Sequence, residues 1–164
     1  MASCDVFLKI GTIDGESTDS KHKGWIEVSS FNMGVAQKST GSRSVGSAAA
    51  GGRADFSDFT ITKRADKASP KVILSCAKGE HIASVSVELC RATGDKTKFL
   101  EYKMSDVLVT NVKMSNDASA DLPTETIAFN FSKLETTYVA TDPKTGKAAG
   151  QVTTSWDLTE NKGS

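Results

Sequence analysis

The alternation of apolar and polar residues along most of this chain indicates β-strands. Near the N-terminus, Val6, Leu8 and Ile10 are apolar, whereas Asp5 and Lys9 are charged. This two-residue period is typical of a strand with one buried face. Similar patterns recur along the rest of the chain, so the sequence predicts a mainly β protein. The segments that predict strands are 4–10, 25–35, 56–63, 84–90, 98–114, 127–131 and 152–158.

The pattern in residues 56–63 predicts an irregular strand. Phe59 and Ile61 share one face, but Phe56 is out of phase with them. A bulge or kink near Ser57 and Asp58 explains the change of phase. Seven or eight strands joined by short links favour a closed barrel or a sandwich.

One segment, residues 70–78, has the period of a helix instead. Ser69 is a suitable N-cap, Pro70 fits the first turn, and Gly79 fits the C-terminal end. So short a helix is marginal alone, and we expect it to pack on the strands. Its apolar stripe is formed by Val72, Ile73, Cys76 and Ala77, and its expected outward residues are Lys71, Ser75 and Lys78.

A low-complexity stretch rich in glycine, serine and alanine lies at about 36–53. It contains one β-branched aliphatic residue and no aromatic residue, so alone it cannot offset its ordering entropy. It is either a flexible hairpin tip or an arm that orders against a neighbouring subunit. For the arm, small side chains allow close approach to a neighbour's strand edge, and basic side chains pair with carboxylates. The arm residues are Lys38, Ser39, Gly41, Arg43, Val45, Gly51 and Arg53.

The charge and cysteine content exclude several classes of protein. The 20 basic and 20 acidic side chains cancel, whereas a nucleic-acid binder usually has a basic surplus. No segment approaches the roughly 20 apolar residues of a membrane span, and no Sec-type signal peptide is expected. Cys4, Cys76 and Cys90 form an odd set without a close pair. We therefore expect no disulfide framework and folding in a reducing cytoplasm.

Two fragments imitate motifs of acyl-transfer enzymes. Residues 75–78 match S-x-x-K and residues 144–146 match K-T-G. That chemistry needs a serine and a lysine on adjacent helical turns, faced by a second lysine on a strand. Here K-T-G lies in a turn-like run, and the chain has no room for the helical domain of such enzymes. The sequence therefore predicts no catalytic site.

The residue spacing also gives no metal or cofactor site. Neither His22 nor His81 has a cysteine or carboxylate at tight metal spacing. The acidic residues Asp14, Glu16 and Asp19 lack the ordered spacing and distal glutamate of a calcium loop. We expect no cofactor.

An ordered set of short segments across nearly the whole chain resembles a known family. The segments are 7–10, 13–17, 22–24, 26–28, 32–34, 59–63, 66–70, 76–79, 106–109, 123–126 and 156–158. In this order they resemble the haemolysin-coregulated protein (Hcp) family, the tube subunit of the bacterial type VI secretion system.

The resemblance implies a single domain over residues 1–164, built as a two-sheet β-barrel with one short α-helix and a long extended loop. It implies a structural protein, not an enzyme. Its subunits would form hexameric rings that stack into a tube in the cytoplasm, with sheath and spike proteins as partners. The tube is then secreted without a signal peptide. Small effectors would lie in the ring lumen, against a surface formed by Phe31, Asn32, Met33, Lys71, Ser75 and Lys78.

A different class of function stays open beside this one. A soluble monomeric β-barrel binding module, for example for a carbohydrate, fits the composition. Such a module is expected to expose an aromatic cluster. The tryptophans and tyrosines fall within strand patterns instead, at Trp25, Tyr102, Tyr138 and Trp156.

Overall fold

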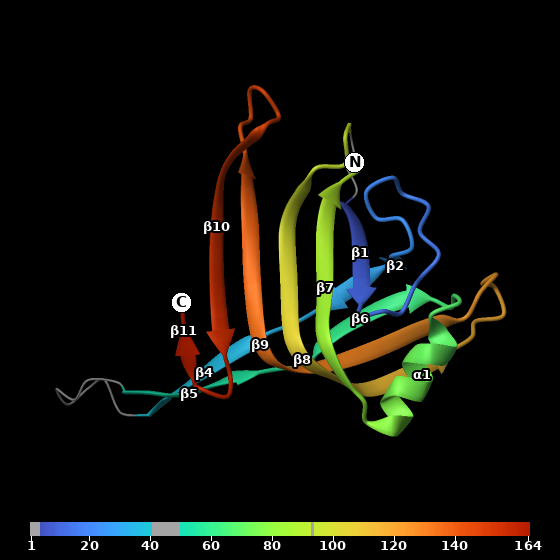
Figure 1. The fold of residues 1–164 in the computed structure, drawn as a ribbon, viewed down its shortest axis with the longest axis horizontal. Coiled ribbons are helices and arrows are strands. Elements are labelled where there is room, and N and C mark those ends of the chain that lie inside the picture. The colour runs from blue at the N-terminus through green and yellow to red at the C-terminus, as the bar shows by residue number, and fades with distance from the viewer. Residues whose placement is uncertain (1–3, 41–49, 93) are drawn as a thin grey trace.

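The computed structural model describes residues 4–40, 50–92 and 94–164, which form strands and one helix (Figure 1). The strands are β1 (Cys4–Ile10), β2 (Ile26–Val28), β3 (Ser30–Asn32), β4 (Val35–Thr40), β5 (Ala50–Phe56), β6 (Phe59–Arg64), β7 (His81–Arg91), β8 (Lys98–Ser115), β9 (Thr124–Thr141), β10 (Ala148–Asp157) and β11 (Lys162–Gly163). The helix is α1 (Ser69–Lys78). The prediction of a mainly β protein with one short helix is confirmed.

The two longest strands, β8 and β9, form the centre of the fold. They pair antiparallel from Leu100 opposite Tyr138 to Ser115 opposite Thr124. Figure 1 shows both strands bending from one sheet direction into another. Asp106 has a φ of 48°, and the register shifts between Val109 and Asn111. Such an irregularity bends a strand. The β8–β9 hairpin therefore forms part of two sheet regions that run in different directions.

The other strands attach to this hairpin on both sides. The hydrogen-bonded order is β11-β10-β9-β8-β7-β1-β2, and β6 pairs with the first half of β9 and with β3. Strands β4 and β5 form a separate hairpin. Among the described strands the principal sheet ends at β11 and β2, and these two edges are not joined. Closure into a two-sheet barrel therefore stays a prediction.

Two expected strands differ most from the structure. The segment 25–35, expected as one strand, is divided by Ser29, whose N–H donates to the carbonyl of Thr62 at 2.8 Å. Before this residue the chain pairs with β1, and after it with β6. Strand β9 also extends well beyond 127–131, because pairing with β10 orders residues whose polarity does not alternate. The expected break at residues 57–58 is confirmed.

The helix has the expected length but a different buried face. It ends at Gly79, whose left-handed φ of 61° confirms the predicted C-terminal cap. Ala68 occupies the N-cap position in place of the expected Ser69. Ser75, expected to point outward, is only 3% exposed, whereas Ile73, expected to be inward, is 46% exposed. The face at Ser69, Val72 and Ser75 is buried because Ser69 is bound into a polar cluster of the core.

This buried cluster joins three elements around Lys63 and Glu125. The two residues are opposite each other on β6 and β9, and both side chains are fully buried. The Lys63 ammonium lies 2.8 Å from a carboxylate oxygen of Glu125 and 2.8 Å from one of Asp66. Ser69 on α1 donates to Glu125 at 2.6 Å. The helix is therefore attached to the sheet by a charged cluster as well as by apolar packing.

Lys63→Met is expected to lower the free energy of unfolding by about 3–5 kcal/mol, because it leaves the Glu125 carboxylate buried without its cation. Urea denaturation monitored by circular dichroism measures this loss. The double variant Lys63→Met/Glu125→Leu removes both charges and should recover part of it. Equal losses in the single and the double variant would contradict this role for the ion pair.

Candidate functional site

The low-complexity stretch forms the strands of a hairpin in the single chain. Strands β4 and β5 pair from Val35 opposite Phe56 to Thr40 opposite Ala50. The hairpin extends away from the principal sheet (Figure 1). The sequence had indicated that this stretch cannot order alone. The backbone hydrogen bonds between β4 and β5 order its two ends, although residues 36–38 and 51–53 are exposed.

The predicted arm residues that the structure describes lie on this hairpin. Lys38 on β4 and Gly51 on β5 are exposed, and Ser39 also lies on β4. Arg53 is exposed too, but its guanidinium donates to the carbonyl of Leu158 at 2.8 Å. This contact attaches the base of the hairpin to the C-terminal segment. The other three predicted arm residues, Gly41, Arg43 and Val45, lie outside the described residues.

The residues predicted to face the lumen come from two separate parts of the fold. On β3, Asn32 is exposed, but Phe31 is half-buried and stacks on Phe59 with ring centroids 5.6 Å apart. Met33, just after β3, packs against the core. The remaining candidates belong to α1, which packs against β8. Lys71 and Lys78 are exposed, and the buried Ser75 is a correction to the predicted surface.

Lys71 and Ser75 line a cavity of about 380 Å³ between α1, the turn after β1 and the start of β7. Ile10, Leu74 and Ile82 form part of its apolar wall. The Ser75 hydroxyl is buried and has no hydrogen-bond partner among the described residues. The helix thus forms one wall of a small, open amphipathic pocket that sequence analysis did not predict.

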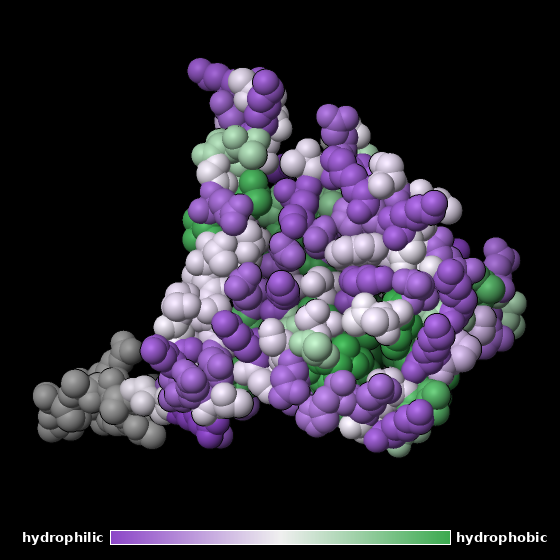
Figure 2. Space-filling model, viewed as in Figure 1, coloured by the Kyte–Doolittle hydropathy of each residue, from purple (hydrophilic) through white to green (hydrophobic). Residues whose placement is uncertain are grey.

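Exposed apolar side chains gather in separate regions of the surface. Ile73 and Leu74 on α1 are 46% and 52% exposed, and Tyr138 on β9 and Val152 on β10 are 46% and 66% exposed. The last two are direct cross-strand partners. Figure 2 shows apolar surface near α1 and, separately, along β9 and β10. Figure 1 places α1 and β10 on opposite sides of the molecule.

Strand β10 also has an unpaired backbone edge. One of its sides pairs with β9. Among the described residues, the other side bonds only near its C-terminal end, to β11 at Trp156 and Asp157 and to Ser164 at Ser155. Residues 148–156 contain no charged residue and no proline. Charge and proline are the usual protection of exposed edges, so this edge is suited to pairing with another strand. Sequence analysis missed it because alternation identifies a strand but not its neighbours.

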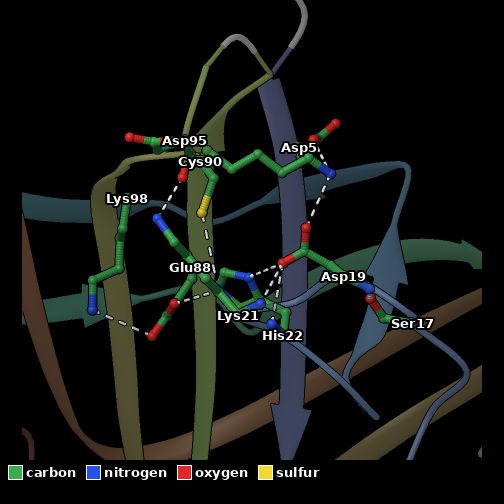
Figure 3. A network of polar contacts seen from close by, with 10 residues as sticks. Asp5, Ser17, Asp19, Lys21, His22, Glu88, Cys90, Asp95 and Lys98 are labelled. Atoms are coloured by element: carbon green, nitrogen blue, oxygen red, sulfur yellow. Dashed lines mark hydrogen bonds and ion pairs between the residues drawn. The ribbon is translucent and has the colours of Figure 1, made fainter. Parts of the chain in front are cut away.

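A polar cluster around His22 connects the β1–β2 loop to the sheet (Figure 3). The ring is 3% exposed, with Nδ1 3.0 Å from Asp19 and Nε2 2.7 Å from Glu88. Lys96 binds the other oxygen of Asp19 at 3.1 Å, and Lys98 binds Glu88 at 3.3 Å. No local sequence pattern indicates this cluster, because Glu88 is 66 positions from His22.

The cluster shifts the titration of several of its members. The hydrogen bond from His22 lowers the pKa of Asp19 from 3.8 to about 2, and Lys96 adds to this effect. Hydrogen bonds to Asp19 and Asp5 raise the pKa of Lys96. Burial raises the pKa of the Cys90 thiol to about 11, so Cys90 stays protonated at neutral pH. These groups stabilise a fixed charge arrangement, and none of them is activated as a nucleophile.

The described residues contain no group of three or more histidine, cysteine, aspartate or glutamate side chains arranged to hold a metal. Cys4, Cys76 and Cys90 are all free thiols. Within the described ranges, no helix is both long and apolar enough to cross a membrane.

The comparison with known proteins identifies the family. The family model described as "Type VI secretion system effector, Hcp" matches residues 7–138, which include the hairpin, the helix and the His22 cluster. The chain belongs to the Hcp family. Protein hcp1 of Pseudomonas aeruginosa is 28% identical over 158 residues, which cover 96% of each chain.

Solved structures of Hcp proteins share this fold. A type six secretion system protein is 35% identical, with a TM-score of 0.93 and coverage of 99% of this chain and 100% of that one. Hcp1 from Salmonella typhimurium is 31% identical with a TM-score of 0.81, and both chains are fully covered. A type VI secretion system effector from Yersinia pestis is 33% identical, with a TM-score of 0.74 and coverage of 93% and 99%. The resemblance of the ordered sequence segments to Hcp is therefore confirmed.

Asp19→Asn is expected to destabilise this Hcp chain in a pH-dependent way. Because folding lowers the pKa of Asp19 from 3.8 to about 2, its contribution to stability is complete above the unfolded value. That contribution is lost as the pH falls from about 4 to about 2. Urea midpoints at several pH values should show a deficit for the variant that shrinks over this window. Asp95→Asn on the neighbouring turn is the control, and a deficit independent of pH would contradict the interpretation.

Proposed function

We propose that this chain is a structural subunit of the type VI secretion tube, which assembles into hexameric rings that stack and are expelled from the cell. The full-length similarity to Hcp structures carries the proposal. Its partners would then be further copies of itself, the sheath and the spike protein. The proposal places assembly in the cytoplasm, followed by secretion through the type VI system.

The exposed apolar residues support assembly of copies side by side. Strand β10, which carries Val152, lies on the side of the molecule opposite α1, which carries Ile73 and Leu74 (Figure 1). Two different patches on opposite sides allow head-to-tail contacts, which close into a ring when the rotation between copies is suitable. Because the net charge of the chain is zero, long-range electrostatic repulsion between copies is weak. A stable contact of this kind buries at least about 1,000 Å².

The hairpin supports a separate contact between rings. It extends from the sheet with exposed strands, and its base is held by the bond from Arg53 to Leu158. A hairpin held at its base reaches a neighbouring copy at a lower entropy cost than a free loop. We assign the arm residues named from the sequence to ring stacking, with barrel walls closing the ring.

The carriage of small effectors is the third part of the proposal. Asn32, Lys71 and Lys78 are the exposed members of the surface predicted to face the lumen. They offer an amide and two cations to a cargo. Ser75 is omitted from this surface because it is buried.

Ring formation predicts a solution mass near that of a hexamer. Val152→Lys is expected to reduce this mass to that of a monomer, because it places a charge on the apolar patch of β10, while circular dichroism stays unchanged. Multi-angle light scattering measures the mass, and Ser20→Lys, at an exposed position on neither apolar patch, is the control. A wild-type monomer at all concentrations would instead favour the monomeric binding module. A hexameric Val152→Lys variant would show that β10 lies outside the ring contact.

Shortening residues 39–51 to a tight turn is expected to preserve hexamers and abolish tubes, because the arm would no longer reach the next ring. Electron microscopy of tubes beside a light-scattering mass for single rings tests both parts. Long tubes from the shortened protein would show that the arm is a hairpin tip without a role in stacking. Loss of rings would assign the arm to the ring contact instead.

A further inference from the structure

The outer edge of β10 carries a short antiparallel strand at its C-terminal end. The N–H of Ser155 donates to the carbonyl of Ser164 at 2.8 Å, and the carbonyl of Ser155 accepts the N–H of Ser164 at 3.0 Å. Beside this pair, Trp156 and Asp157 pair with β11 (Figure 1). The chain's own C-terminal segment therefore demonstrates that this edge accepts a strand.

The same two bonds identify the backbone groups that face the rest of the edge. In an antiparallel strand, every second residue directs both its N–H and its carbonyl to the same side. Because Ser155 directs its groups toward β11, Thr153 and Gln151 direct theirs toward the same outer side. No backbone group of the described residues pairs with Gln151 or Thr153 there. Two donors and two acceptors are thus available to another strand.

This edge window, residues 151–154, is bounded at both ends. On its N-terminal side, the register with β9 shifts between Ala148 and Gly150, and Gly150 has a φ of 145°. Such a bulge interrupts regular pairing. On its C-terminal side, β11 covers the edge. A Cβ added at Gly163 would lie 2.9 Å from the ring of Trp156, so glycine is what allows β11 to lie this close.

The side chains of the edge window suit a strand of a second copy. The window contains no charged residue and no proline, the two usual barriers to pairing at an edge. Val152 is 66% exposed and forms an apolar pair with Tyr138 across the strands. This apolar pair belongs to the patch assigned above to the contact between copies. The threonines at 153 and 154 are polar and exposed, so side chains alone specify the register weakly.

We infer that the edge window binds a strand of a second copy through the backbone of Gln151 and Thr153, and that β11 is the register stop for this pairing. The inference rests on the proposed ring. A slip by one residue would turn the apolar side chains of the incoming strand away from Val152. The bulge at Gly150 and the strand at 162–163 prevent the slip in either direction. The C-terminal segment thereby limits the contact to one register.

Amide exchange of the wild-type protein tests the pairing directly. In hexamers, the amides of Gln151 and Thr153 should exchange at least about tenfold more slowly than in the Val152→Lys variant, where no second copy covers them. The amide of Ser155, bound to Ser164 within the chain, is the internal reference. Equally fast exchange in wild-type hexamers would overturn the inference alone. A wild-type monomer would contradict the proposed ring itself, and the two failures are therefore distinguishable.

Thr153→Pro removes one of the available donors. Proline is tolerated in an edge strand where its missing N–H would face away from the neighbouring strand. We therefore expect an unchanged circular dichroism spectrum and ring dissociation at about tenfold higher protein concentration. Thr153→Val is the matched control, because it loses the same hydroxyl contact with Thr137 but keeps the N–H. Equal ring stability in the two variants, or unfolding of Thr153→Pro alone, would overturn the inference.

Removal of residues 159–164 tests the register stop. The free edge then extends to Asp157, and we expect particles larger than a hexamer with a broad mass distribution in light scattering. Gly163→Val should have the same effect by displacing β11 from the ring of Trp156. Lys162→Ala, at an exposed position of the same strand, is the control. Uniform hexamers or monomers from the shortened chain would show that β11 does not limit the pairing.

Discussion

The antiparallel pairing of β8 with β9 is the constraint on which the other elements depend. A two-stranded ribbon is marginal in water, so both parts of this long hairpin must be covered. One part lies between β7 and β10, and the other carries β6 and α1. The irregularity at Asp106 and Val109 turns the hairpin between these two directions. The position of each remaining element follows from the part of the hairpin that it covers.

Two buried polar clusters then fix the elements that apolar packing alone would leave free to slide. The cluster at Lys63 and Glu125 attaches α1 to β6 and β9, and the cluster at His22 attaches the β1–β2 loop to β1 and β7. A buried charge without its partner costs several kcal/mol, so each cluster tolerates one arrangement. Such clusters contribute more to a defined position than to net stability.

The same architecture leaves strand edges and apolar side chains at the surface. Strand β10 keeps an uncharged free edge beside Val152, and the β4–β5 hairpin extends from the sheet. A monomeric protein usually protects such edges with charge, proline or a covering element. In a subunit that assembles with its own copies, such edges provide contacts between the copies. The family and the exposed edges therefore lead to the same proposed role.

Local patterns in the sequence determined the class of fold, the positions of most strands, the end of α1 at Gly79 and the likeness to Hcp, because these depend on neighbouring residues. The tertiary structure alone decided which face of α1 is buried: Ser69 binds Glu125, 56 positions away, and this contact turns Ser75 inward. It also divided residues 25–35 between two partner strands and brought Glu88 to His22. No periodicity encodes such contacts, because each depends on how distant segments pack together.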